Sequence, residues 1–175
     1  MQRRDLLRLL GTGALLPFVP RSLDAAIRFG RAAHIAAARG DLEVLTPAQA
    51  ELVTTLADLI LPRTDTPGAS DVGVTGFVDH LLATWYHDDE REQFLAGLAE
   101  IDTRSGGKFT SLPAGDQARL LESLDGLEGS PGSAESEFGR LKALTVYGSF
   151  TSEQVVKEVT RDPLIPGRFD GCVKT

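Results

Sequence analysis

Apolar residues recur at helical spacing along most of the chain. Beyond Thr46, apolar side chains return every three or four residues until Pro62, which ends the run. The same spacing predicts further helices with these apolar faces: Phe77, Val78, Leu81, Leu82 and Trp85; Phe94, Leu95, Leu98 and Ile101; Leu120, Leu121 and Leu124; Phe138, Leu141, Leu144 and Tyr147; Val155, Val156 and Val159. No stretch alternates apolar and polar residues, so strands are not expected. The pattern predicts an all-α fold, one irregular domain of about five to seven helices.

Two helix starts are marked by capping residues. Thr46 can cap a helix that has Pro47 at its first position and Gln49 at its third, the arrangement of a capping box. Thr151-Ser152-Glu153-Gln154 repeats the signal ahead of the last apolar run. These signals place helix boundaries near residues 46 and 152.

Three segments between or after the helices are rich in helix-breaking residues. Residues 62–73 (PRTDTPGASDVG) contain two prolines and two glycines and form a longer connection than most compact domains use. Residues 125–136 combine glycine, serine and acidic residues and predict a surface loop. The tail after Asp162 has two prolines and two glycines, so we expect it to be extended.

The first residues have the features of an export signal. Arg3 and Arg4 precede the apolar stretch from Leu9 to Val19. Eleven apolar-rich residues are too few to cross a membrane, which takes roughly 20. A paired arginine before such a stretch is typical of the twin-arginine route, which carries folded proteins.

Where this leader ends is left open by the sequence. The alanine-rich segment Ser22 to Arg39 is helix-prone, and either an exposed helix or a part of the leader would fit it. Ala36-Ala37-Ala38 has small residues at the spacing of a cleavage site, and a cut between Pro20 and Ala26 fits equally well. We therefore divide the chain into a signal segment with its helical lead-in, residues 1–39, and a helical domain, residues 40–175.

Charge separates the same two parts. Residues 1–39 hold seven arginines and two aspartates, a net charge of +5, whereas residues 40–175 carry a net charge of −12. A domain this acidic repels phosphate and anionic membrane surfaces. Nucleic-acid binding is therefore not expected, and membrane association is expected only through a partner.

The residues that usually hold metals or cofactors are scarce. His80 and His87 lie near Asp79 and Asp88, yet no Glu-x-x-His pair, no His-Glu-x-x-His and no dinucleotide fingerprint occurs. Cys172 is the single cysteine, so it cannot form an internal disulfide. We expect no catalytic residue, no cofactor site and no metal site in the chain itself.

Several segments together resemble one family. They are Leu56-Ala57-Asp58-Leu59-Ile60-Leu61-Pro62-Arg63-Thr64-Asp65-Thr66-Pro67-Gly68-Ala69, Val72-Gly73-Val74, Phe77-Val78-Asp79, Phe94-Leu95-Ala96-Gly97-Leu98, Tyr147-Gly148-Ser149-Phe150-Thr151-Ser152-Glu153 and Pro166-Gly167-Arg168-Phe169-Asp170-Gly171-Cys172. Over roughly residues 45–172 the chain resembles subunit 3, the small or gamma subunit, of gluconate 2-dehydrogenase-type complexes.

The resemblance implies a three-component periplasmic dehydrogenase. A large flavoprotein of the glucose-methanol-choline (GMC) oxidoreductase type holds FAD and oxidises the CH–OH group of a sugar or polyol. A multihaem cytochrome c passes the electrons to the membrane. The small subunit carries the twin-arginine leader and serves as the export escort and stabiliser of the flavoprotein, without a catalytic site of its own. The complex, not this chain, would make the contact with the membrane.

The resemblance also suggests where the partner binds. A long loop bracketed by prolines is rigid enough to present a surface, although a plain helix connection explains it too. Four aromatic side chains can each belong to an interface or to the core, namely Trp85, Tyr86, Phe150 and Phe169. The predicted partner contacts are Pro62, Thr64, Asp65, Pro67 and Phe169.

Cys172 gives a sharper expectation under the same resemblance. A lone cysteine on an extended tail, in an oxidising compartment, can form a disulfide with a cysteine of the flavoprotein. A free or buried thiol is the alternative.

Two other functions fit the residues. One is a stand-alone exported helical protein that binds a ligand, or a metal through His80 and His87. The other is a redox-inert scaffold for a different oxidoreductase.

Overall fold

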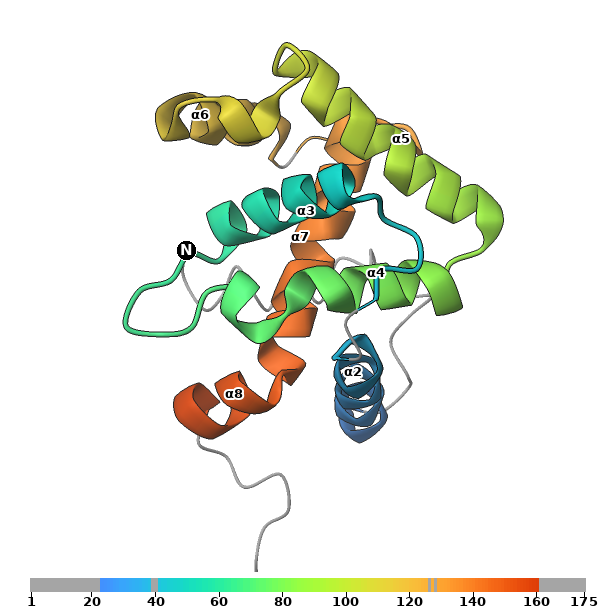
Figure 1. The fold of residues 1–175 in the computed structure, drawn as a ribbon, viewed down its shortest axis with the longest axis vertical. Coiled ribbons are helices and arrows are strands. Elements are labelled where there is room, and N and C mark those ends of the chain that lie inside the picture. The colour runs from blue at the N-terminus through green and yellow to red at the C-terminus, as the bar shows by residue number, and fades with distance from the viewer. Residues whose placement is uncertain (1–22, 39–40, 126, 128, 161–175) are drawn as a thin grey trace, which may run out of the picture.

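The computed structural model describes residues 23–38, 41–125, 127 and 129–160. Seven α-helices lie in this part, and none of its residues is in a strand, so the predicted all-α class is confirmed (Figure 1). The α-helices are α2 (Leu23–Ala37), α3 (Pro47–Ile60), α4 (Val74–Thr84), α5 (Asp88–Arg104), α6 (Ala114–Leu124), α7 (Ala134–Thr151) and α8 (Glu153–Val155). Two 3-10 turns, η1 (Ser70–Val72) and η2 (Phe109–Ser111), and a π-helical end, η3 (Val156–Thr160), complete the fold.

The helix boundaries follow the capping signals of the sequence. Thr46 Oγ1 accepts a hydrogen bond from the N–H of Gln49, whose side chain accepts one from the N–H of Thr46 at 2.9 Å. Ser152 caps α8 in the same way, since its Oγ accepts from the N–H of Val155. Both predicted starts are therefore confirmed.

Helix α7 is the centre of the fold. It contacts α2, α3, α4, α5 and α6, and in Figure 1 it runs behind α3 and α4. The core consists of fully buried side chains from α7 itself and from α4, α5 and η2, namely Phe77, Phe94, Leu98, Phe109, Leu141 and Leu144. Gly148 lets α4 approach α7, because a Cβ atom at this position would lie 2.8 Å from Phe77.

A buried carboxylate fixes the segment before α3. Asp79 on α4 accepts hydrogen bonds from the backbone N–H groups of Glu43, Val44 and Leu45, over 2.7, 3.0 and 2.7 Å. Its side chain therefore satisfies three donors that have no helix or strand to bind them. This anchor sets the direction in which the chain enters the cap at Thr46.

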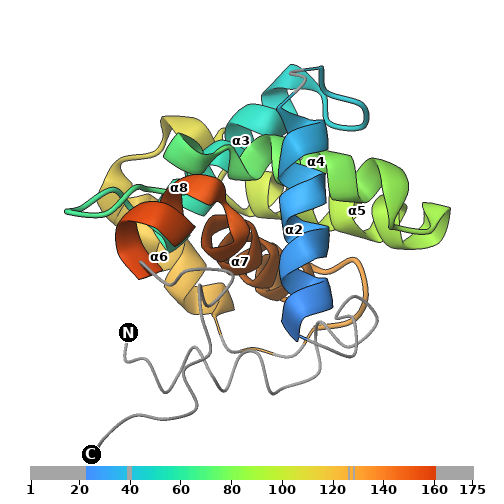
Figure 2. The ribbon, with the colours of Figure 1, turned by 90° about the horizontal axis from the view of Figure 1, so that it is seen from below.

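Helix α2 packs against the rest of the fold. It crosses α4 and α7, and Figure 2 shows it standing beside α7 and in front of α4. Its residues Ala26 and Ala33 are buried. The predicted domain boundary between residues 39 and 40 lies outside the described residues, while the helix ahead of it is part of the packed structure.

Candidate functional site

The loop between α3 and α4, residues 62–73, is built as a fixed projection. Figure 1 shows it extending beyond the ends of both helices. At its base the N–H of Ala69 donates to the carbonyl of Leu61 at 3.0 Å, and the N–H of Ser70 donates to Asp58 at 2.9 Å. Ala69 is completely buried, so the loop is anchored in the core at one point.

Asp71 holds the outer half of this loop. Its carboxylate pairs with both Nε and Nη2 of Arg63, and the Nε–Oδ2 distance is 2.7 Å. The same Oδ2 accepts the N–H of Gly68 at 2.9 Å. A side chain at Gly68 would meet the backbone nitrogen of Arg63 at 2.9 Å, so glycine is needed for this close turn. Two other parts of the loop, at Arg63 and Gly68, thus converge on the Asp71 carboxylate.

The predicted contact residues of this loop lie on its outside. Pro62, Thr64 and Asp65 are exposed, and Pro67 is half-buried. Thr64, Asp65 and Pro67, together with Gln154 of α8, border an open depression of about 220 Å³. The loop therefore offers polar side chains on a constrained backbone, which is what a recognition surface requires.

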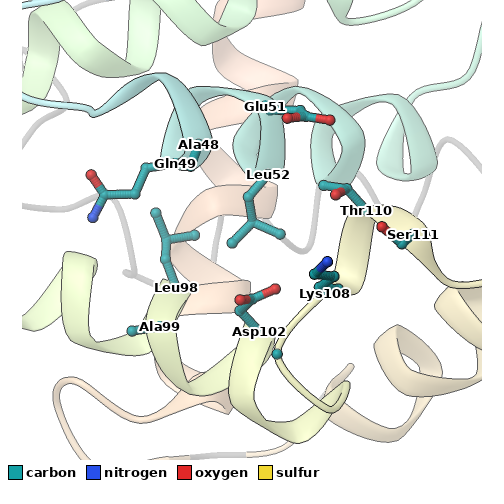
Figure 3. Close-up of a pocket in the computed structure, with 11 residues that line it drawn as sticks. Ala48, Gln49, Glu51, Leu52, Leu98, Ala99, Asp102, Lys108, Thr110 and Ser111 are labelled. Atoms are coloured by element: carbon teal, nitrogen blue, oxygen red, sulfur yellow. The ribbon is translucent and has the colours of Figure 1, made fainter.

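A larger depression lies between α3, α5 and η2 and measures about 470 Å³ (Figure 3). Leu52 and Leu98 form its apolar floor, while Glu51 and Lys108 stand at its rim. Asp102, also in the lining, already accepts the N–H of Phe109 at 2.8 Å. Its lining thus combines an apolar floor with charged side chains and includes no histidine or cysteine.

Two of the ambiguous aromatic side chains lie at the surface. Trp85, at the end of α4, is 49% exposed, and Phe150, near the end of α7, is 43% exposed. The ring of Phe29 on α2 packs edge-on against Trp85 with 4.2 Å between centroids. Exposed aromatic rings are over-represented in the centres of protein interfaces, so both residues are candidates for partner contact.

The histidines are dispersed. His34 lies against Phe77, His80 has Nδ1 at 3.4 Å from Glu43, and His87 precedes α5. Across the described residues no group of three or more histidine, cysteine, aspartate or glutamate side chains could hold a metal ion. His80 and His87, which the sequence placed together in one alternative, are not joined there in a metal site.

Four of the predicted site residues lie outside the described part of the chain. These are Arg3 and Arg4 of the leader, and Phe169 and Cys172 of the tail. The predictions for them stay predictions.

Comparison with models of known protein families assigns the chain to one family. A profile described as Gluconate 2-dehydrogenase subunit 3 matches residues 47–167, from the start of α3 into the tail. The chain belongs to this family. No curated protein and no solved structure matches the chain.

Membership in the subunit 3 family makes this chain one component of a multi-subunit gluconate dehydrogenase-type complex. The matched range contains the whole 62–73 loop and the larger depression, and it leaves out α2. Among the described helices, none has the length and apolar content needed to cross a membrane.

Sequence reasoning missed the two residues that shape the loop. Asp71 and Arg63 look like ordinary surface charges in sequence, and nothing in their spacing of eight residues marks a pair. It also missed the depression of Figure 3, because its walls come from three elements that only the fold brings together.

Proposed function

We propose that the chain is the non-catalytic small subunit of a periplasmic, FAD-dependent dehydrogenase of the GMC type that oxidises a sugar or polyol. The observation that carries this is membership in the subunit 3 family. In this proposal FAD belongs to the large flavoprotein subunit and haem c to a multihaem cytochrome subunit. The chain itself binds neither and performs no redox step.

The role proposed for the chain is to export and stabilise the flavoprotein. The paired Arg3 and Arg4 address the chain to the twin-arginine route, which accepts folded cargo. A flavoprotein that must bind FAD in the cytosol can use this address if it is already bound to the small subunit. The complex would hold both proteins at the membrane.

The partner surface proposed for this role centres on the 62–73 loop. Its backbone is held by Asp58 and Asp71, so binding would order few residues and lose little conformational entropy. Trp85 and Phe150 add exposed aromatic area on other elements. A disulfide between Cys172 and the flavoprotein would lock the pair in an oxidising compartment.

The test is export of flavoprotein activity from cells that make both subunits. Arg3→Lys combined with Arg4→Lys is expected to leave FAD-dependent dehydrogenase activity in the cytoplasm, while Arg8→Lys in the same leader is the matched control and preserves periplasmic activity. Periplasmic activity that survives the double substitution contradicts the escort role. An absorbance spectrum and metal content of the chain made alone test the stand-alone alternative, which requires a bound chromophore or stoichiometric metal.

A further inference from the structure

Helix α2 is joined to the fold by close backbone packing. Gly30 is buried against α7, where a Cβ atom would lie 2.5 Å from Oγ1 of Thr151. At the C-terminal end of α2, Ala37 lies beside Gly76 of α4, where an added Cβ would make ordinary contact at 3.5 Å. The absence of a side chain at Gly30 lets α2 approach α7, and any side chain there must push the two helices apart.

Polar contacts fix the register of α2. The hydroxyl of Tyr147 donates to the carbonyl of Ala26 at 2.6 Å, and Nε2 of His34 lies 2.6 Å from the carbonyl of Gly148. These pairs are 121 and 114 residues apart in the chain. Burial raises the pKa of Tyr147 to about 12, so its hydroxyl keeps its proton at physiological pH.

Aromatic rings complete the contact. Phe29 of α2 lies between Trp85 of α4 and Tyr147 of α7, with centroid distances of 4.2 and 6.5 Å. The ring of His34 stacks on Phe77, which is completely buried. Removing α2 would expose the Phe77 side of the core to solvent, which is unfavourable because apolar surface would return to water.

We infer that the exported protein retains α2, so that any removal of the leader ends before Leu23 and Ala36-Ala37-Ala38 is not a cleavage site. This inference rests on the proposed export. It settles the choice between the two cleavage positions in favour of the one nearer the apolar stretch, because the other would cut away a packed helix.

The geometry around the alanines supports the same conclusion. Ala36 and Ala37 form the end of α2, and the N–H of Ala38 continues the helix by donating to the carbonyl of His34 at 3.0 Å. A peptidase binds its substrate as an extended strand. Cleavage after Ala38 would therefore require the last turn of α2 to unwind and leave its place beside Gly76.

One test reads the N-terminus of the exported chain. The full chain is made together with its flavoprotein partner in an exporting bacterium, and the periplasmic product is analysed by intact mass and N-terminal sequencing. The expected N-terminus lies ahead of Leu23. An N-terminus at residues 37–39 would overturn the inference. A chain found only in the cytoplasm with its leader intact would instead contradict the proposed export, and the second test then decides the role of α2.

The second test measures amide hydrogen exchange in the purified full chain and does not depend on export. Amides of residues 26–37 are expected to exchange as slowly as those of α4. Gly30→Leu should speed exchange in this helix at least tenfold, and Ala32→Leu, on the exposed side of the same helix, should not. Exchange in α2 as fast as in an unfolded chain, or equal exchange in the two variants, would overturn the inference.

Discussion

Asp79 accepts a hydrogen bond from the backbone N–H of Leu45, over 2.7 Å and across 34 residues of sequence. The carboxylate is 2% exposed, and its other two donors come from the residues just before Leu45. A loop that has no helix or strand of its own is thus held by one acid on α4. Residues 43–45 lead directly into α3. The C-terminal end of α3 continues into the 62–73 loop, which is the proposed partner surface.

Replacing Asp79 tests this anchor. Asp79→Asn keeps the shape but turns an NH2 group towards backbone donors, so we expect the free energy of unfolding to fall by about 2–3 kcal/mol. Urea titration followed by circular dichroism measures the change. Asp41→Asn, in an exposed residue shortly before the anchored segment, serves as the control and should leave stability unchanged. Equal stability of the two variants would show that the three hydrogen bonds contribute little.

Stability should depend on pH through His34. Burial lowers the pKa of His34 below its ordinary value, and the bond to Gly148 opposes this only in part. The unfolded chain therefore takes up the proton at a higher pH than the folded protein does. The stabilisation from neutral His34 is complete above about pH 6.5 and is lost as the pH falls from that value through the lower pKa of the folded state. His34→Gln, which cannot titrate, should lack this part of the loss. Urea unfolding midpoints of both proteins at pH 7.5 and 5.5 measure this loss of stability. An equal decrease of the midpoint in the two proteins would show that His34 is not its source.

Replacement by alanine should change the stability of the fold in opposite directions at two glycines. Gly97 of α5 faces α7, and a Cβ atom there would lie 2.4 Å from Cβ of Glu137, so Gly97→Ala should destabilise the fold by about 1–3 kcal/mol. A Cβ atom added at Gly139 of α7 would have no neighbouring atom within 4 Å. Gly139→Ala should therefore stabilise the fold by about 0.5–1 kcal/mol through helix propensity. Thermal unfolding of both variants compares them directly, and the same sign for both would contradict the packing described here.

Local signals were sufficient to predict the helices, and distant contacts were not predictable. The cap at Thr46 and Gln49 lies within four residues, so its chemistry is visible in the sequence. The bond from Asp79 to the segment before α3 depends on how two helices cross, and Asp79 reads as an ordinary polar position on α4. The same limit applies to α2: its alanines suit a leader or an exposed helix equally well. Its packing is visible only in contacts with residues distant in sequence, such as Phe77 of α4 and Tyr147 of α7.

At the 62–73 loop, an effect on flavoprotein binding can be separated from an effect on the stability of the fold. Asp71→Asn weakens the charge pair with Arg63, which is exposed, so global stability should change by less than about 1 kcal/mol. Affinity for the flavoprotein should fall, because a looser loop must be ordered on binding. Titration calorimetry against the purified flavoprotein measures this. Asp116→Asn removes a comparable surface pair with Arg119 on α6 and should bind normally; equal affinities would exclude the loop from the interface.

The single cysteine gives a covalent test of the complex. If Cys172 forms a disulfide with the flavoprotein, non-reducing electrophoresis of the purified complex shows one band at the combined mass, and reductant separates it into two. Cys172→Ser should give two bands under both conditions. Separate subunits from the unaltered complex without reductant would rule the bridge out.

Trp85 is the only tryptophan of the chain, and it lies half-exposed with its ring against Phe29. This position makes it a natural optical reporter. Its emission colour depends on water contact, so release of α2 from α4 should shift it to the red, whereas coverage by a partner should shift it to the blue. A flavin absorbs in the same range as tryptophan emits, so a nearby flavoprotein would also quench it. One unlabelled fluorescence signal can therefore distinguish loosening of the N-terminal helix from assembly of the complex.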